Sequence, residues 1–383
     1  MNTSHLAGPL VGLRVVELAG MGPGPFAAML LADMGAEVIQ IERPTVNGGS
    51  IPPEQDVLRR SRASAAIDLR TPRGVAAVLE MVSSAAVLIE GFRPGVTERL
   101  GIGPDVCHAR NPKLIYARMT GWGQDGPLSD TAGHDISYLA RTGALHAMGR
   151  AGQAPAIPVN LVGDFGGGSL YLVVGILAAV YEAERSGRGQ VVDAAIVDGA
   201  ASLTSVLYGM MSAGMWRDER GVNLLDSGVP WYDVYQTSDG KHVAVGAIEP
   251  QFFAELVRVL GLDLGEQDRR DASKWPVMRR QIADRLVTRT RDEWTRIFEH
   301  TDACVSPVLS LTEARRDPHL SARGSFLEVN GIAQPAPAPR FSRTPAAVQS
   351  PPAGLGHDTR HTLQRWGVSG IDELLADGIA FQG

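Results

Sequence analysis

The stretch that decides the fold is Leu13-Arg-Val-Val-Glu-Leu-Ala19, followed directly by the turn Gly20-Met-Gly-Pro-Gly-Pro25. The mainly apolar first part predicts a short buried strand, and the turn leads into a predicted helix over residues 26–34. Val38-Ile-Gln-Ile-Glu42 predicts the next strand. A strand, a helix and a second strand in this order are typical of a parallel βαβ unit.

The same alternation continues along the first half of the chain. It predicts further strands at 86–90, 114–118 and 191–196, and helices at 74–84, 169–185 and 198–216. Alternating strands and helices indicate an α/β fold with a Rossmann-like, doubly wound parallel sheet.

The second half has a different pattern. Residues 231–247 predict a hairpin around the turn Ser238-Asp-Gly240, and residues 249–300 read as mainly helical. This part predicts a smaller α+β domain. Residues 335–353 are rich in proline and predict an extended segment that crosses between domains.

Composition excludes several classes of protein. The 383 residues suggest two or three folding units, and a net charge of −6 argues against nonspecific nucleic-acid binding. Cys107 and Cys304 are too few for a disulfide framework or a cysteine-based zinc site, and they fit a reducing cytosol. Residues 1–9 do not resemble a signal peptide, and the apolar run 170–181 is too short to span a bilayer. We therefore expect a cytoplasmic protein with no membrane or nucleic-acid partner.

The glycine turn after the first strand invites comparison with a dinucleotide-binding loop. Gly20 and Gly22 fit that pattern, and Glu42 stands where a ribose-binding acid would lie. However, Pro25 occupies the third glycine position, and Pro23 removes an amide from the loop. A tight turn that packs a helix on the sheet is therefore the better interpretation than a nicotinamide or flavin site.

Three arginines favour an anionic ligand. Arg43, Arg93 and Arg99 stand at strand or loop junctions, and ligands of doubly wound sheets bind at strand carboxyl ends. Arginine forms bidentate contacts with phosphate. For any single arginine, solvated surface charge is the alternative, but together the three predict a phosphate-bearing ligand.

Two segments carry candidate acid–base groups. His134 lies in Gly133-His-Asp135, and Asp164 is followed closely by Gly166, Gly167 and Gly168 just before a predicted helix. A carboxylate there is stabilised by the helix dipole, and we expect the glycines to admit a ligand close to the backbone. The alternatives are that Asp164 is only a helix N-cap and that His134 is structural.

With these motifs identified, the chain closely resembles the α-methylacyl-CoA racemases, within the wider CaiB/BaiF (class III CoA-transferase) family. The similarity runs from about Gly8 to the C-terminal region. It rests on motifs in the same order, which are Gly-Leu-Arg-Val-Val-Glu-Leu-Ala at 12–19, Phe-Arg-Pro-Gly-Val at 92–96, Thr-Gly-Trp-Gly-Gln at 120–124, Gly-His-Asp-Ile at 133–136, Gly-Asp-Phe-Gly-Gly-Gly at 163–168, Ala-Ile-Glu-Pro at 247–250 and Ala-Pro-Arg-Phe-Ser-Arg-Thr-Pro at 338–345.

The resemblance implies a role for each site residue. His134 and Asp164 match the two groups that act on opposite faces of the α-carbon, and Glu249 matches the glutamate that orients the histidine. Asp135 matches the acid whose backbone amide lies near the thioester oxygen. The arginines match positions near the CoA phosphates, and two further residues, Tyr138 and Asn160, match residues that line the site.

The resemblance also implies an interlocked homodimer, with the active site between the large domain of one subunit and the small domain of the other. Residues 1–200 and 330–383 then form a large Rossmann-like CoA-binding domain. A helical linker spans 201–229, and a small domain spans 230–329.

The implied reaction interconverts (R)- and (S)-2-methylacyl-CoA thioesters by 1,1-proton transfer through an enolate, and it needs no metal or redox cofactor. One alternative is a CoA-transferase of the same superfamily, in which Asp164 is the nucleophile. Another is a catalytically silent acyl-CoA-binding protein. Branched fatty acids, sterol side chains and 2-arylpropionyl groups would all offer the same α-methyl centre.

Overall fold

The computed structural model describes residues 6–45 and 51–383, which divide into two compact units. The first unit comprises Met1–Thr142, Val159–Leu203 and Ala322–Gly383. The second comprises Gly143–Pro158 and Thr204–Ser321. Residues 143–158 thus belong to the second unit, although they lie inside the range predicted for the large domain.

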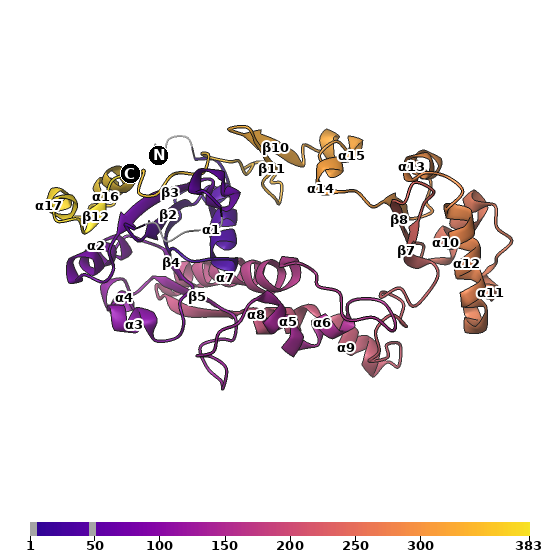
Figure 1. Cartoon of the computed structure of the whole chain (residues 1–383). Helices are drawn as coiled ribbons and strands as arrows, with labels where there is room; N and C mark the ends of the chain where they lie inside the picture. Colours follow the sequence, from indigo (N-terminus) through magenta and orange to yellow (C-terminus); the bar gives the residue numbers. More distant parts are fainter. Residues whose placement is uncertain (1–5, 46–50) are drawn as a thin grey trace. The chain divides into compact units, whose positions relative to one another are not determined.

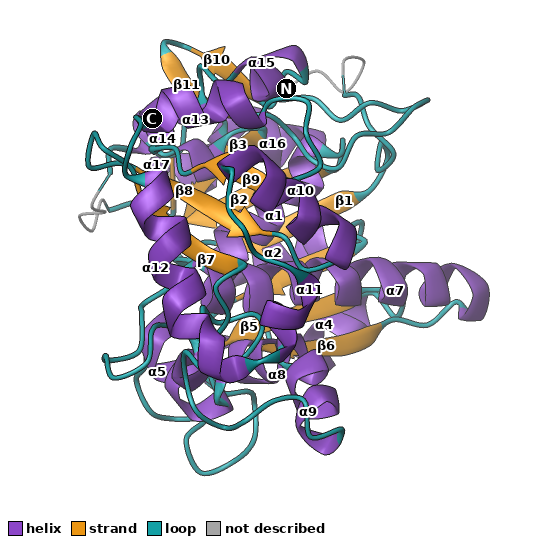
Figure 2. Cartoon of the chain, turned by 90° about the vertical axis from the view of Figure 1, so that its right-hand side faces the viewer, coloured by secondary structure: helices purple, strands orange, loops and turns teal. Residues whose placement is uncertain are grey.

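The first unit is built on a seven-stranded sheet in the order β12-β3-β2-β1-β4-β5-β6 (Figures 1 and 2). Its strands are parallel except for β12, which runs antiparallel to β3. The order 3-2-1-4-5-6 is that of the doubly wound Rossmann sheet, so the predicted fold class is confirmed. The strands are β1 (Arg14–Leu18), β2 (Glu37–Glu42), β3 (Arg62–Ile67), β4 (Val87–Glu90), β5 (Ile115–Thr120), β6 (Gln190–Ala195) and β12 (Ala380–Phe381).

Two strands of this sheet were not predicted. The β3 sequence Arg-Ala-Ser-Ala-Ala-Ile has only one β-branched apolar residue, so its local signal for a strand is weak. The β12 strand has two residues and forms only by pairing with β3. Both depend on neighbours that are distant in sequence.

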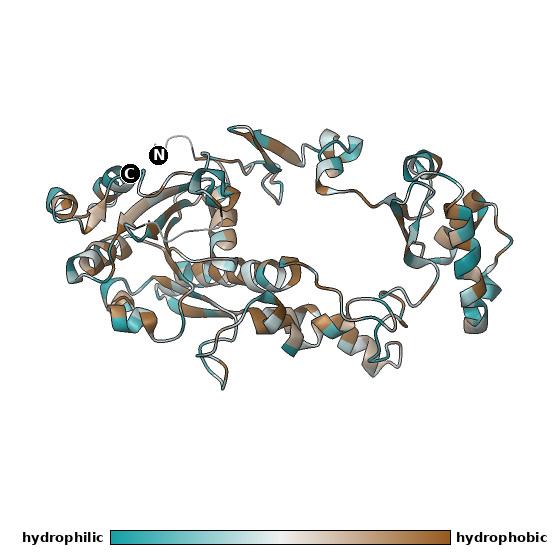
Figure 3. Cartoon of the chain, viewed as in Figure 1, coloured by the Kyte–Doolittle hydropathy of each residue, from teal (hydrophilic) through white to brown (hydrophobic). Residues whose placement is uncertain are grey.

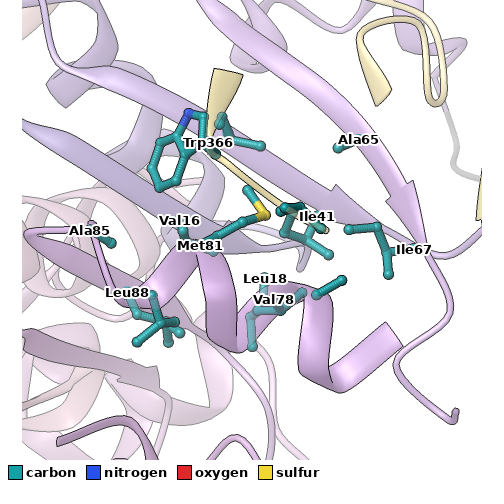
Figure 4. Close-up of a cluster of buried hydrophobic side chains, with 14 of the residues drawn as sticks. Val16, Leu18, Ile41, Ala65, Ile67, Val78, Met81, Ala85, Leu88 and Trp366 are labelled. Carbon is teal, nitrogen blue, oxygen red and sulfur yellow. The ribbon is translucent and has the colours of Figure 1, made fainter. Parts of the chain in front are cut away.

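Helices cover both faces of the sheet. One core contains α2 (Pro72–Val82) and α4 (Pro104–Arg110), and the other contains α1 (Pro23–Asp33) and α7 (Leu170–Ser186) (Figure 1). Figure 4 shows Val78 and Met81 of α2 among strand residues of the first core. The other elements of this unit are α3 (Val96–Leu100), α5 (Asp135–Thr142), the π-helical segment η4 (Leu161–Ser169), α8 (Ile196–Leu203), β10 (Phe326–Val329), β11 (Ile332–Pro335), α16 (Thr359–Arg365) and α17 (Ile371–Ala376), with the short turns η2 (Pro53–Gln55) and η3 (Val57–Arg59).

The prediction of a single helix over residues 198–216 is wrong. The chain forms α8 and then a separate helix, α9 (Ser205–Ser212), with Thr204 at the N-cap of α9. The amides of Leu207 and Tyr208 donate to the Thr204 carbonyl. The break also marks the passage from the first unit to the second. Small apolar residues continue across it, which is why composition did not reveal the break.

One helical run among the described residues, Leu161–Ser186, is long and apolar enough to cross a bilayer by those two measures alone. It is longer than the apolar run 170–181 on which the prediction rested. Its inner face, which includes Leu172, Ile176 and Ala183, is buried in the second core of the sheet. This face therefore serves as part of the interior of the first unit.

The proline-rich segment is extended, as predicted, but the prediction that it crosses between domains is wrong, because the chain re-enters the first unit already at Ala322. The amide of Ala347 donates to the Asp33 carbonyl at 3.0 Å, and the amide of Ser61 donates to the Ser350 carbonyl at 2.9 Å. Further along the chain, Leu363 and Trp366 join the core around α2. The C-terminal residues thus complete a domain that the N-terminal residues begin.

The second unit contains the predicted hairpin, β7 (Tyr232–Gln236) and β8 (His242–Gly246), with β9 (Val305–Pro307) added antiparallel to β8. Its core packs this sheet against mainly helical residues, which confirms the α+β pattern. Its helical elements are α6 (Ala144–Ala147), α9, α10 (Pro250–Leu260), α11 (Glu266–Arg270), η5 (Ala272–Lys274), α12 (Trp275–Leu286), α13 (Arg291–Phe298) and α14 (Leu311–Ala314), and α15 (Pro318–Ala322) lies at the boundary of the two units.

The ion pairs among strands β1, β2 and β3 include two with little exposed side-chain surface. Arg62 pairs with Glu17, and each side chain is 1% exposed. Arg59 binds the carboxylate of Glu42 through both terminal nitrogens, at 2.8 and 2.6 Å. Burial raises the pKa of Glu17, and the nearby Arg62 opposes that rise. Because a buried charge without a partner is strongly disfavoured, the Glu17 carboxylate depends on Arg62.

We therefore predict that Arg62→Met lowers the free energy of unfolding by about 3–5 kcal/mol at neutral pH. Without Arg62 the pKa of Glu17 rises further. A carboxyl whose pKa is raised by folding stabilises the protein below its unfolded pKa, and this contribution is lost as the pH rises through the folded value. The decrease in the free energy of unfolding caused by Arg62→Met should therefore be larger at alkaline than at acidic pH, as measured by urea unfolding.

Arg73→Met is the control, because Arg73 and its partner Asp377 are half exposed and such pairs contribute little. An Arg62→Met variant as stable as Arg73→Met at alkaline pH would contradict this assignment.

Candidate active site

The candidate site lies at the carboxyl edge of the seven-stranded sheet. The strand order reverses between β1 and β4, and ligands of doubly wound sheets bind outside the carboxyl ends of the strands at such a point. The loop after β1 carries Gly20 to Gly22, and the loop after β4 carries Arg93. The loop after β5 carries Trp122. The topology therefore collects these loops at one edge.

The loop after β1 contacts the segment that carries Asp164. Gly22 caps α1 with a φ of 70°, and a Cβ built on it would lie 3.3 Å from the Asp164 Oδ2. The Ser169 hydroxyl donates to the Pro23 carbonyl at 2.7 Å. The rings of Phe26 and Phe165 stack with centroids 4.4 Å apart. The start of α1 thus fixes one side of η4.

Asp164 lies in the first turn of a continuous helical run, near a helix N-terminus as predicted. It belongs to the π-helical η4, which leads directly into α7, so the run begins at Leu161 and not at the predicted residue 169. The wide π-turns are stabilised by tertiary contacts and occur often at functional sites. The N-cap of η4 is Asn160, so Asp164 is not a cap.

The electrostatic surroundings of Asp164 include the other predicted acid–base residues. Burial raises its pKa most, and the charge of Asp135 raises it further. A hydrogen bond from the Asn160 side chain and the nearby charge of His134 lower it. His134, Asp135, Asn160 and Asp164 are therefore neighbours, although the chain separates them by up to thirty positions.

Asp135 joins α5 to η4. Its carboxylate accepts the Asp164 amide at 2.7 Å and also the Gly163 amide. A Cβ at Gly163 would lie 2.2 Å from Asp135 Oδ1, so only glycine leaves room for this contact. Burial raises the pKa of Asp135, and the two amides partly offset that rise. One carboxylate thus sets the spacing between the helix that follows His134 and the turn that holds Asp164.

His134 immediately precedes α5 and is exposed. Its carbonyl accepts the Ser137 amide at 2.7 Å and the Tyr138 amide at 3.3 Å, which closes the first turn of the helix. The first amides of a helix have no acceptor within it, so those of Asp135 and Ile136 are suited to stabilise a negative charge beside the histidine.

Tyr138 is held in a slot between two glycines. Cβ atoms at Gly121 and Gly133 would lie only 2.0 Å and 2.6 Å from its ring. Its hydroxyl donates to the Gly133 carbonyl at 2.6 Å, and the Trp122 ring meets it edge-on at 4.8 Å. Burial, followed by the charge of Asp164, raises the pKa of Tyr138. The ring therefore connects the loop after β5 to the segment before His134.

The glycines after Asp164 do not serve the predicted purpose. A Cβ at Gly167 would lie 2.7 Å from the Ala200 amide nitrogen in α8, and one at Gly168 would lie 3.1 Å from Ile196 and Pro23. They allow η4 to pack closely on α8 and α1. The expectation that they admit a ligand is therefore wrong for these two positions.

The three arginines are all exposed near the carboxyl edge. Arg43 follows β2 and helps to lower the pKa of Asp68, although hydrogen bonds from Arg70 have the larger effect. Arg93 follows β4, and its charge lowers the pKa of Tyr138 against the dominant effect of burial. Arg99 lies on α3 with Nη1 3.1 Å from a Cβ built on Gly95. Since β1 lies between β2 and β4, Arg43 and Arg93 flank its loop.

Glu249 belongs to the second unit. It is exposed at the N-cap of α10, directly before Pro250. Arg269 donates to the carbonyl of the preceding Ile248 and stacks on the Trp231 ring with its guanidinium carbon 4.5 Å from the centroid. The segment that carries Glu249 is thus fixed within its own unit, and its contact with His134 stays a prediction.

Two other ligand types find no support at this edge. Glu42, which would bind a ribose in a dinucleotide site, is already paired with Arg59 through both carboxylate oxygens. Within residues 6–45 and 51–383, no group of three or more His, Cys, Asp and Glu side chains is arranged to hold a metal ion.

Three residues that were not among the predicted site residues shape the site without carrying a reactive group. Gly22, Trp122 and Gly163 each contact a predicted site residue. The glycine after β1 had a signal, because it follows the first strand of a doubly wound pattern. Gly163 belongs to the motif at 163–168, but its contact with Asp135 had no local signal because Asp135 is distant in sequence.

Comparisons with known proteins identify the family of this chain. The model of CoA-transferase family III matches residues 10–359. The alpha-methylacyl-CoA racemase of Mus musculus is 46% identical over 365 residues, and that of Homo sapiens is 43% identical over 367 residues, each covering 94% of both chains. A crystal structure of a CaiB/BaiF family protein from Brucella suis superposes with a TM-score of 0.81 at 25% identity, covering 94% of this chain and 100% of the other. The chain therefore belongs to CoA-transferase family III.

Proposed function

We propose that this chain is an α-methylacyl-CoA racemase that interconverts (R)- and (S)-2-methylacyl-CoA thioesters through an enolate. The observation that carries the proposal is the proximity of His134 to Asp164, since the charge of His134 lowers the pKa of that carboxyl against the larger effect of burial. The racemase relatives, which match nearly the whole chain, support the same reaction.

Inversion at the α-carbon needs two groups, because a single base returns the proton to the face from which it came. One group must start deprotonated, so that it can act as the base, and the other must start protonated, so that it can act as the acid. His134 and Asp164 are proposed to exchange these roles with the direction of reaction. Proton transfer between two side chains requires neither a metal nor a redox cofactor.

The surroundings of Asp164 suit it to this exchange. A free aspartic carboxyl is about 2.6 pKa units more acidic than an imidazole, and each unit of mismatch is about 1.36 kcal/mol. Burial and the neighbouring Asp135 raise the pKa of Asp164 and so bring it closer to that of an imidazole. The two groups can then serve as acid or base in either direction with a smaller difference in barrier.

The enolate oxygen needs preorganised hydrogen-bond donors, because the thioester α-proton is far less acidic than either conjugate acid. The amide of Asp135 at the start of α5 is the proposed donor. Arg43, Arg93 and Arg99 are proposed to bind the CoA phosphates, with Tyr138 and Asn160 lining the thioester. Binding energy from the distant phosphates then holds the reacting carbon between the two groups.

The family name also supports a second candidate, a CoA-transferase in which Asp164 attacks the thioester as a nucleophile. In that reaction the Asp164 carboxylate forms an acyl anhydride, and CoA thiolate leaves. Incubation with an acyl-CoA and a free carboxylate distinguishes the two. Only a transferase forms a new thioester and an intermediate on Asp164 that hydroxylamine traps.

We further propose that the chain works as a homodimer, and α7 supports this. Its outer face presents Leu170, Val174 and Tyr181, which are 49%, 65% and 64% exposed and follow the spacing of one helix face. Long parts of α7 are brown in Figure 3. A helix that is apolar on both faces is normally covered on both. A second copy of the chain is the proposed cover, and it would bring the partner's Glu249 to His134.

We predict that His134→Ala and Asp164→Ala each lower the rate of interconversion by about 10³-fold, since each removes one of the two proton-transfer groups. Affinity for the CoA ester should change by only a few fold. Proton NMR in deuterated water measures loss of the α-hydrogen signal of each enantiomer. Exchange that survives in a single variant should be restricted to one enantiomer.

The exposed His319 provides the control, because His319→Ala should leave interconversion unchanged. Interconversion by the double variant His134→Ala/Asp164→Ala would show that the assignment is wrong.

We predict that Asp135→Asn shifts the pH profile to lower pH. The amide oxygen of asparagine can still accept the Gly163 and Asp164 amides, but the charge that raises the pKa of Asp164 is gone. Asp164 then stays ionised to lower pH, so the acid limb of the kcat/KM profile shifts to lower pH for the enantiomer that Asp164 deprotonates. For the other enantiomer Asp164 must start protonated, so the alkaline limb of that profile shifts to lower pH.

Asp130→Asn, in the loop before His134, serves as the control and should leave both limbs in place. An Asp135→Asn profile that overlays the wild-type profile in both directions would argue against coupling between the two carboxylates.

We predict that Val174→Glu weakens dimerisation, because it places a charge on the apolar face of α7. Sedimentation equilibrium should show a dimer for the wild type and a raised dissociation constant for the variant. Glu182→Lys, on an exposed polar position of the same helix, should leave the dimer intact. A monomeric wild-type protein would contradict the proposal.

A further inference from the structure

Arg118, at the carboxyl end of β5, is a buried arginine that the proposed chemistry does not use. Only 7% of it is exposed, although its guanidinium lies at the edge where the ligand loops meet. Its three nitrogens contact three different segments. These are the end of β4, helix α3, and the loop after β5.

The first contact holds the loop that carries Arg93. Arg118 Nε lies 3.3 Å from Glu90 Oε1, and Glu90 is 3% exposed at the end of β4. The other oxygen, Oε2, accepts the Phe92 amide at 2.8 Å. The buried carboxylate thus connects Arg118 to the residue directly before Arg93.

The second contact holds the helix that carries Arg99. The Nη2 of Arg118 donates to Oε1 of Glu98, which immediately precedes Arg99 on α3. Gly103 keeps the other side of Glu98 free, since a Cβ there would lie 2.9 Å from the Glu98 Cγ. Glu98 itself is partly exposed, so its carboxylate reaches Arg118 from the rim of the edge.

The third contact holds the loop after β5. The Nη1 of Arg118 donates to the Gln124 Oε1 at 2.6 Å, and the Gln124 amide donates to Asp193 Oδ2 of β6 at 3.0 Å. Two residues earlier in the same loop, Trp122 packs on Tyr138. The contact therefore ties Arg118 to the loop that holds the segment before His134.

We propose that Arg118 is a positioning residue that fixes helix α3, which carries Arg99, and the loops bearing Arg93 and Trp122 in one arrangement, so that the CoA phosphates and the reacting carbon are held at a set distance. The proposal rests on the function proposed above. An arginine suits the task because its planar guanidinium directs donors toward several acceptors at once, which a lysine cannot do.

The placement distinguishes this role from stabilisation alone. A buried carboxylate such as Glu90 would be satisfied by one cation, yet Arg118 also bonds two groups outside β4 and β5. All three partners lie on the ligand edge of the sheet. Loss of Arg118 should therefore loosen loops that bind the substrate, while the sheet beneath them stays paired.

The test uses Arg118→Met and the double variant Arg118→Met/Glu90→Gln. Burial raises the pKa of Glu90 to about 7, so this carboxyl can take up a proton when Arg118 is lost, and the single variant should fold in mildly acidic buffer. The double variant removes the unpaired charge altogether. Its thermal stability should recover, whereas its contacts to Glu98 and Gln124 stay absent.

We expect both variants to raise the KM for 2-methylacyl-CoA and the dissociation constant for free CoA by about tenfold or more, because the arginine loops lose their arrangement. The kcat at saturating substrate should fall less than KM rises. Arg93→Ala is the reference for loss of phosphate binding. Arg14→Met is the matched control, because Arg14 bonds Ser84 and covers Trp366 at the start of β1, away from the ligand edge.

Recovery of both stability and KM in the double variant would overturn the proposal, since Arg118 would then act only by pairing Glu90. An unchanged KM in a folded Arg118→Met variant would overturn it as well. Failure of the proposed function gives a different result. In that case the wild-type enzyme would not exchange the α-hydrogen, whereas the affinity for free CoA would still report on Arg118.

Discussion

The carboxylate of Asp135 accepts two backbone amides from η4, and the arrangement of the candidate site depends on this contact. It joins the helix that begins after His134 to the turn that holds Asp164. The contact is possible only because position 163 has no side chain. The same carboxylate raises the pKa of Asp164, so one group sets both the spacing and the proton affinity of the proposed acid–base pair.

Around this contact, the sheet supplies the frame. The reversal of strand order beside β1 opens the carboxyl edge, and the loops after β1, β4 and β5 meet there. Buried ion pairs keep these elements in register. Arg62 pairs with Glu17 within the sheet, and Arg118 pairs with Glu90 at its edge. Because removing one member of a buried pair is strongly unfavourable, the charged residues of the strands are as constrained as the apolar ones.

Strands and helices were predicted correctly where their own residues carry the pattern, and they were missed where residues distant in sequence form them. Strands β1, β2, β4, β5 and β6 were predicted because their own residues carry the pattern, and the hairpin of β7 and β8 because its turn has a local signature. Strand β3 was missed because its small residues become a strand only between neighbours. The predicted helix over 198–216 was wrong because a continuous apolar composition concealed the break at Thr204.

By itself, the sequence determined the fold class, the family resemblance and the types of residue available for chemistry, because these follow from local periodicity and from motifs in a fixed order. Only the tertiary structure decided which residues meet. It placed Asp164 in the first turn of a π-helical segment that begins before the predicted helix, and it assigned Gly167 and Gly168 to helix packing rather than to a ligand. It also showed that the Glu42 carboxylate pairs with Arg59. Each of these depends on a partner distant along the chain, and local sequence patterns carry no record of such partners.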